Sequence, residues 1–122
     1  MQIRVYYEDT DCMGIVYHTN YLKYCERARS EWFFANEGKD LLKENPFALR
    51  EIKAIYKAPA KLGDILEVKN ILVGFDKYCL ELKQIIYKDD KAIFEAFIKL
   101  VHIKDGKLSP ISEELKEYLS VR

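Results

Sequence analysis

The sequence predicts an α+β domain in which an antiparallel sheet packs against one long helix. Four strand-like runs follow one another between residues 48 and 103, and short links join the later ones. Short links suit antiparallel neighbours, whereas parallel strands need long crossovers. Between residues 21 and 36, apolar side chains instead recur every three or four positions, which is typical of an amphipathic helix. This helix must bury its apolar stripe, and the sheet is the largest surface available.

The N-terminal third contains the first strand and the helix. Residues 3–7 are β-branched and aromatic and predict a strand, and the polar run 8–14 that ends in glycine predicts a loop. Thr19 or Asn20 suits the N-cap of the helix at 21–36, and Gly38 suits its stop.

The rest of the chain predicts mainly strands, at residues 48–56, 65–75, 78–87 and 92–103. The run 57–64 interrupts them, and residues 76–77 and 88–91 suit hairpin turns. Ser112 begins a pattern typical of a capped, short terminal helix. The predicted order is strand, long helix, four strands and short helix, within one domain that spans residues 1–122.

Composition excludes some classes of function. A chain of 122 residues suits one domain, and 49% hydrophobic with 33% charged residues is the balance of a soluble globular protein. Twenty basic side chains face twenty acidic ones, so the formal net charge is zero. A nucleic-acid partner is therefore not expected, because no basic excess exists to displace counterions.

The sequence also predicts a cytoplasmic protein without a membrane span. No apolar run approaches the roughly 18–20 residues that cross a bilayer, and the N-terminus lacks the apolar region of a secretory signal. Cys12, Cys25 and Cys79 are odd in number and form no closely spaced pair. Neither a disulfide framework nor a metal site is predicted from them.

Functional side chains are densest between residues 7 and 20. This run holds three carboxylates, one of the two histidines, a loop glycine and the expected start of the helix. A carboxylate beside a helix start combines a nucleophile or base with backbone N–H groups that can hold an oxyanion, which suits acyl transfer. The same residues also suit a purely structural role, in which Asp9, Thr10 and Asp11 cap turns and Gly14 permits a tight bend.

A resemblance to a known family covers the same run. Residues 7–21 read YEDTDCMGIVYHTNY, residues 24–29 read YCERAR and residues 56–60 read YKAPA, followed by Gly63 and Asp64. This pattern resembles the 4-hydroxybenzoyl-CoA thioesterase family, and within it the YbgC-type acyl-CoA thioesterases associated with the Tol–Pal system. The resemblance implies a hotdog fold, an antiparallel sheet wrapped around one long central helix. It also implies a homo-oligomer of edge-to-edge dimers, commonly a tetramer, with active sites at subunit interfaces.

The resemblance also implies roles for individual residues. The family's catalytic aspartate precedes the loop glycine by three residues and matches Asp11. His18 matches the position whose backbone N–H polarises the thioester carbonyl. His18 and Tyr7 are both typical of the YbgC-type branch, and with Asp11 they are the expected catalytic residues. The remaining positions expected to contact substrate along this run are Gly14, Val16 and Tyr17.

The expected reaction is hydrolysis of acyl-CoA to free acid and CoA. Asp11 either attacks the carbonyl directly or activates a water, and the sequence leaves both routes open. The CoA thiolate is a good leaving group, so no metal is required, and CoA enters as part of the substrate rather than as a cofactor. The phosphates of CoA need cationic partners. The candidates are Lys77, in the turn that matches a basic cluster of related enzymes, and Lys57 and Lys61. All three lysines could equally be solvated surface residues.

Other side chains have structural alternatives. We expect Asp9 to order the loop, Cys12 to pack against other side chains, and His102 to be a structural residue with its hydrogen bonds satisfied. Glu26 and Arg29 lie three positions apart on the helix and suit an ion pair, although Glu26 could also brace the loop. The aromatic residues that suit either an acyl pocket or the core are Trp32, Phe33, Phe34 and Phe47.

Three other functions compete with an acyl-CoA thioesterase. The chain could hydrolyse thioesters of acyl carrier protein, which would need a basic docking face. It could be a dehydratase of the same fold, but the catalytic histidine with an acidic partner on a different helix is missing. It could be a non-catalytic binding protein of the Tol–Pal system, although such a protein would be free to lose Asp11.

Overall fold

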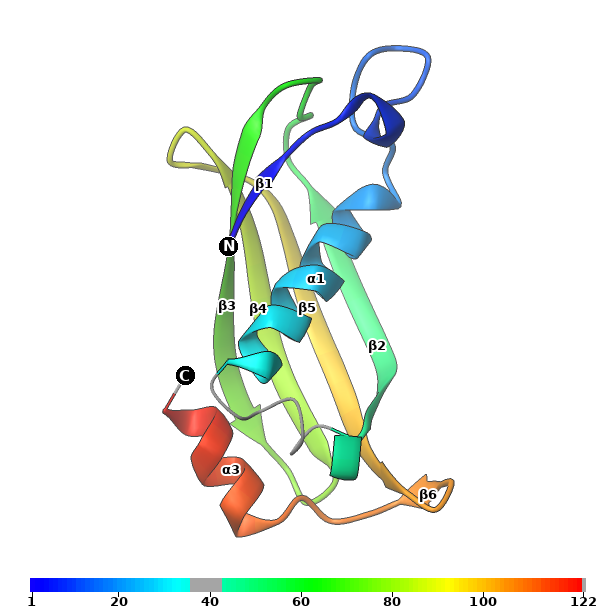
Figure 1. Ribbon diagram of the computed structural model, residues 1–122, viewed down its shortest axis with the longest axis vertical. Coiled ribbons are helices and arrows are strands. Elements are labelled where there is room, and N and C mark those ends of the chain that lie inside the picture. The colour runs from blue at the N-terminus through cyan, green and yellow to red at the C-terminus, as the bar shows by residue number, and fades with distance from the viewer. Residues whose placement is uncertain (36–42, 122) are drawn as a thin grey trace.

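The computed structural model describes residues 1–35 and 43–121, in which a curved antiparallel sheet wraps around helix α1 (Asn20–Phe34) (Figure 1). The strand order is β1-β3-β4-β5-β2, and β6 pairs with β5. The strands are β1 (Gln2–Arg4), β2 (Phe47–Tyr56), β3 (Ile65–Phe75), β4 (Cys79–Lys88), β5 (Lys91–Lys104) and β6 (Lys107–Leu108). A short helix, α3 (Glu113–Ser120), begins at the predicted cap Ser112, whose hydroxyl accepts from the Leu115 N–H at 3.1 Å. The predicted α+β hotdog architecture is confirmed.

One predicted boundary is wrong, and one short strand was not predicted. The first strand ends at Arg4, and Tyr7 belongs instead to a 3-10 helix, η1 (Tyr7–Asp9). The Asp9 carboxylate accepts a hydrogen bond from the Tyr6 N–H at 2.8 Å, and this local bond competes successfully with strand pairing. Strand β6 was also not predicted, because two residues are too few for a periodic pattern. Gly38, the predicted helix stop, lies outside the described residues.

Helix α1 lies on the concave face of the sheet and contacts β3 (Figure 1). Cys25 and Ala28 are fully buried on its inner face, and their small side chains let the helix approach the strands closely. Each fully buried aliphatic side chain contributes about 1.5–3 kcal/mol of transfer free energy. The core beneath the helix is built mainly from Leu66, Val68, Leu82, Ile86, Phe94 and Ile98.

Strand β2 is the long edge of the sheet. It pairs with β5 on one side, and no strand pairs with its other side within the described residues. None of its ten residues is fully buried, whereas β4 and β5 have many buried positions. A long unpaired edge of this kind is a template for pairing with another chain.

The hairpin turns follow the prediction. Between β4 and β5, Asp89 and Asp90 have φ of 49° and 64°, the left-handed conformation that two-residue hairpin turns of the primed type require. Between β3 and β4, the Asp76 N–H donates to the Cys79 carbonyl at 2.9 Å. His102 is the predicted structural histidine, since it is buried and its ring bonds the Ser109 carbonyl at 3.0 Å.

The predicted pair between Glu26 and Arg29 is replaced by a bond into the core. Arg29 donates from Nη1 to Oε1 of the buried Gln84 at 3.0 Å, and burial lowers the pKa of its guanidinium. Burial also raises the pKa of the Cys25 thiol to about 12, so this cysteine is a packing residue. Within the described residues no helix is long and apolar enough to cross a membrane.

Tyr24 provides a test of the packing under α1. Its hydroxyl is buried without a hydrogen-bond partner in the described chain, although the nearby Asp9 carboxylate adds to the effect of burial in raising the pKa of the phenol. We expect Tyr24→Phe to leave the free energy of unfolding unchanged or to raise it by up to about 1 kcal/mol, since no bond is lost. Urea denaturation measures this change.

Tyr21→Phe is the matched control. The Tyr21 hydroxyl accepts from the Ala60 N–H at 3.0 Å, so its removal leaves a buried donor unpaired and should cost about 1–3 kcal/mol. A loss of stability in Tyr24→Phe as large as that in Tyr21→Phe would show that the Tyr24 hydroxyl does form a bond with Asp9.

Candidate active site

The loop that carries Asp11 is a tight hairpin. Thr10 pairs with Val16 as an isolated bridge, and the Asp11 N–H donates to the Ile15 carbonyl at 2.9 Å. The Gly14 N–H closes the turn on the Asp11 carbonyl at 3.1 Å, and Gly14 has φ of 80°, which favours glycine. The expectation that Gly14 permits a tight bend is confirmed.

The Asp11 carboxylate is partly exposed, and only one of its two oxygens accepts a hydrogen bond within the turn. Its Oδ1 accepts from the Met13 N–H at 2.8 Å, and its Oδ2 has no hydrogen bond within the described residues. The carboxylate also lies close enough to influence Tyr21: burial raises the pKa of that phenol, and the charges of Asp64 and Asp11 raise it further. One carboxylate oxygen is therefore available for chemistry beside the tyrosine.

The start of α1 has no side-chain cap. Thr19 occupies the N-cap position in helical conformation without a side-chain bond, and Asn20 donates its Nδ2 to the Asp9 carbonyl at 2.9 Å instead. Thr19 is therefore the N-cap by position, as predicted, but its side chain does not cap the helix. The His18 N–H has no acceptor among the described residues. A helix start with free N–H groups carries partial positive charge and suits a developing negative charge.

Asp9 orders the segment between the Asp11 loop and the helix, as predicted. Its carbonyl accepts from the Tyr17 N–H at 2.9 Å as well as from Asn20. Its carboxylate caps η1 through the Tyr6 N–H. Through these bonds, Asp9 holds the backbone in place both before and after Asp11.

Tyr56, at the end of β2, holds the peptide that follows His18. Its hydroxyl donates to the His18 carbonyl at 2.7 Å, and burial raises the pKa of this phenol. Its ring packs edge-on against Tyr21 and Phe94, with centroids 5.5 and 4.9 Å away. The role of Tyr56 was not predicted, although it belongs to the 56–60 segment that carries part of the family resemblance.

A recess of about 280 Å³ opens beside the helix start. Its walls are mostly apolar, and Lys57 at its edge forms an ion pair with Glu95 at 3.0 Å, which lowers the pKa of the Glu95 carboxyl. A larger cavity, of about 480 Å³, lies at the other end of α1 and includes Phe33, Phe34 and Phe47. The recess is lined by Ile15, Val16, His18, Tyr21, Tyr56, Lys57, Ala58 and Pro59.

Not every predicted site residue lies at this recess. Lys77 lies in the β3–β4 turn at the opposite end of the sheet, with its ammonium 5.3 Å from the centre of the Tyr78 ring (Figure 1). The Tyr7 side chain is 82% exposed, and Tyr17 is exposed with its ring 4.4 Å from that of His18. Cys12 is exposed, so its predicted packing role is wrong within this chain, because the turn directs it to solvent.

The recess therefore gathers Val16, His18 and Lys57, whereas Asp11 and Gly14 are not among its lining residues. Their turn adjoins the recess through Ile15, whose carbonyl accepts the Asp11 N–H. Among the described residues, no three His, Cys, Asp or Glu side chains lie close enough together to hold a metal ion. The arrangement combines an available carboxylate oxygen, an unpaired N–H at a helix start and an apolar wall. These are the elements needed to polarise a carbonyl group and to attack it or to activate a water.

Comparison with known proteins identifies the family. A family model described as the thioesterase-like superfamily matches residues 5–119. The acyl-CoA thioesterase YbgC of Helicobacter pylori strain J99 is 42% identical, and the match covers 98% of each chain. The acyl-CoA thioester hydrolase YbgC of Escherichia coli O6:H1 is 34% identical over 88% of this chain and 84% of its own.

A solved structure agrees with this assignment. The crystal structure of a hypothetical protein from Aquifex aeolicus matches with a TM-score of 0.91 and 30% identity, covering 98% of this chain and 97% of that one. Sequence and fold thus agree over nearly the whole length of the chain. The chain belongs to the thioesterase-like superfamily, and its relatives there include the YbgC acyl-CoA thioesterases, as the resemblance predicted.

Proposed function

We propose that this protein hydrolyses acyl-CoA thioesters to a free acid and CoA, with Asp11 as the reacting carboxylate. The observation that carries the proposal is the unpaired His18 N–H at the start of α1, held beside the apolar recess and the Asp11 turn. The printed names of the Helicobacter pylori and Escherichia coli relatives, a thioesterase and a thioester hydrolase of acyl-CoA, support the same reaction.

In the proposed mechanism, the thioester carbonyl oxygen accepts the His18 N–H, and the helix dipole stabilises the negative charge that develops on it. Asp11 then attacks the carbonyl carbon through its free oxygen, which expels the CoA thiolate and leaves a mixed anhydride for water to cleave. In the alternative route, Asp11 takes a proton from a water that attacks directly. Both routes consume one water and yield acid and thiol.

The acyl chain and the CoA portion of the substrate are assigned to the residues that lie nearest to the reacting group. The apolar walls of the recess suit the acyl carbons next to the carbonyl, and Lys57 at its edge suits a phosphate of CoA. Lys77 lies in the β3–β4 turn, at the opposite end of the sheet from the recess (Figure 1), so a contact between Lys77 and the substrate requires a second copy of the chain. The long unpaired edge of β2 supports such a homo-oligomer.

Asp11→Asn tests the proposal. Asparagine keeps the oxygen that accepts the Met13 N–H, so the turn should fold normally, but the nucleophile or base is lost. We expect at least a hundredfold loss of turnover, in the range of losses typical for removal of a general base. The measurement is thiol release from acetyl-, butyryl-, lauroyl-, palmitoyl- and benzoyl-CoA.

Asp9→Asn is the control, because it removes the same charge from the same loop and keeps an oxygen for the Tyr6 N–H. It should retain turnover within about threefold. Equal rates for Asp11→Asn and wild type would exclude Asp11 as the reacting group. Release from acyl carrier protein thioesters alone would identify a carrier-protein thioesterase, and no release from any thioester would favour a binding role.

Tyr56→Phe tests the positioning of the His18 peptide. Loss of the bond to the His18 carbonyl leaves the N–H less well fixed, and we expect kcat to fall about tenfold with little change in KM. The free energy of unfolding should fall by only about 0.5–1.5 kcal/mol. Tyr78→Phe, whose hydroxyl makes no bond in the described chain, should match wild type; equal kcat values for both variants would contradict the role of Tyr56.

A further inference from the structure

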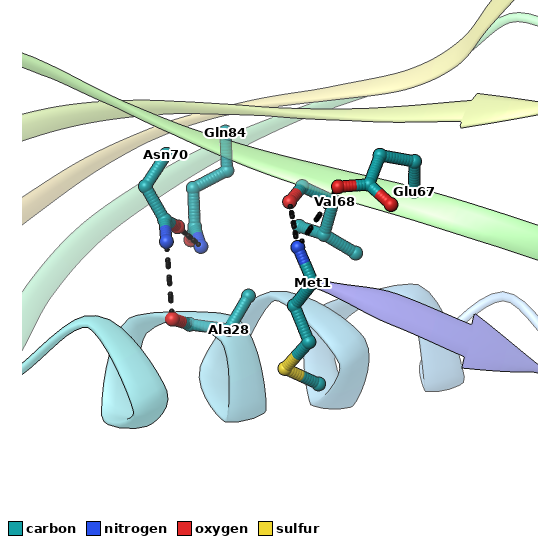
Figure 2. Close-up of polar contacts among 6 residues, drawn as sticks. All are labelled: Met1, Ala28, Glu67, Val68, Asn70 and Gln84. Atoms are coloured by element: carbon teal, nitrogen blue, oxygen red, sulfur yellow. Dashed lines mark hydrogen bonds and ion pairs between the residues drawn. The ribbon is translucent and has the colours of Figure 1, made fainter. Parts of the chain in front are cut away.

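A buried and a half-buried amide beneath the middle of α1 form a hydrogen-bonded cluster with the helix backbone (Figure 2). Asn70 on β3 and Gln84 on β4 face each other directly in the strand register, and Gln84 is completely buried. Gln84 donates from Nε2 to the Cys25 carbonyl at 2.8 Å and to Asn70 Oδ1 at 2.6 Å. Asn70 donates from Nδ2 to the Ala28 carbonyl at 3.0 Å.

Arg29 fixes the orientation of this cluster. Its Nη1 donates to Gln84 Oε1, so the Gln84 amide must present its NH₂ group to the helix and to Asn70. Asn70 in turn must present its oxygen to Gln84 and its NH₂ to Ala28. The hydrogen bonds therefore run in one direction, from Arg29 through both amides to the backbone of the helix. We call Arg29, Asn70 and Gln84 the amide clamp.

Stability alone does not explain the clamp. Burying polar groups and satisfying them gives little net stabilisation, and apolar side chains of the same shape often serve a core equally well. The clamp instead fixes the position and rotation of α1. Van der Waals packing lets a helix slide or rotate by small amounts, whereas hydrogen bonds to specific carbonyl groups do not. Cys25 and Ala28 lie on the same face of α1, so bonding both fixes rotation about the helix axis.

The clamp bonds the middle of α1, between two other side-chain bonds to its backbone. Tyr56 bonds the His18 carbonyl just before the helix, and the Tyr118 hydroxyl donates to the Phe33 carbonyl at 3.1 Å at its other end. These two bonds set the direction of the helix axis. The clamp, about 10–15 Å along the axis from His18, fixes the rotation of the helix about that axis. His18 directly precedes the N-cap Thr19, so this rotation affects where the free N–H at position 18 points.

We propose that Arg29, Asn70 and Gln84 are positioning residues for the reaction, which act by aiming the His18 N–H at the substrate carbonyl. The inference rests on the proposed thioesterase activity and adds to it residues that touch neither substrate nor the Asp11 loop. A misdirected N–H loses transition-state stabilisation while the recess still binds substrate. The effect should therefore appear in kcat rather than in KM.

The test is the double variant Asn70→Leu/Gln84→Met, which replaces both amides by apolar side chains of similar size and lets Arg29 turn to the neighbouring Glu26. Thiol release is followed with whichever of the five acyl-CoAs above wild type cleaves fastest. We expect kcat to fall about tenfold or more and KM to stay within about twofold of wild type. The thermal midpoint should stay within a few degrees.

The control is Ile86→Val, which shortens a fully buried side chain on the same strand, two residues from Gln84. It lowers stability without touching the clamp, so its kcat should equal that of wild type. If Ile86→Val lowers kcat as much as the double variant, or if the double variant keeps wild-type kcat, the positioning role is refuted. Asn70→Leu alone, which keeps Gln84 bonded to Arg29 and Cys25, is measured in the same way should the double variant not fold.

A second readout separates this inference from the proposed activity. In ¹H–¹⁵N spectra, the amide resonances of His18 and Thr19 should move in the double variant and stay in place in Ile86→Val. Such a shift in a protein that cleaves no thioester would support the clamp as the device that aims the helix and refute only the proposed reaction. Unmoved His18 and Thr19 resonances in the double variant would overturn the inference whatever the activity.

Discussion

The backbone N–H of His18, just before α1, has no acceptor among the described residues, and the surrounding elements hold this start of the helix in place. Asp9 bonds the backbone just before it, Tyr56 bonds the His18 carbonyl, and the recess keeps an apolar wall beside it. Free donors at a helix start are costly to bury unless something accepts from them. An exposed, firmly held helix start is therefore well suited to a substrate oxygen and of little use as a purely structural feature.

The sheet makes this arrangement possible. Its inner strands, β4 and β5, are heavily buried and supply a rigid floor, whereas the edge strand β2 is largely exposed and brings Tyr56 to the helix start. Satisfied amides in the floor bond the middle of the helix. Polar groups thus appear in the core where they define the position of α1, and apolar groups supply the bulk of the stability.

Periodicity and residue type predicted most of the fold, because the α1 stripe, the alternating strands and the Asp89–Asp90 turn depend on neighbours in sequence. The turn from Asp11 to Gly14 was predictable for the same reason. The bond from Tyr56 to His18 joins residues 38 positions apart, so no local pattern reveals it. The strand assignment of Tyr7 and the packing role of Cys12 were wrong, because one local hydrogen bond or turn decides where a strand ends and where the side chains beyond it point. Likewise, Lys57 and Lys77 lie at opposite ends of the sheet because of how the strands are connected, and no local sequence pattern reveals this.

The most direct test of this account is a crystal structure with a ketone analogue of an acyl-CoA, in which a methylene group separates the carbonyl from the sulfur. We expect the carbonyl oxygen to lie about 2.7–3.1 Å from the His18 nitrogen, with the free oxygen of Asp11 facing the carbonyl carbon. A bound analogue whose carbonyl points away from His18, or whose carbonyl carbon lies out of reach of Asp11, would contradict it.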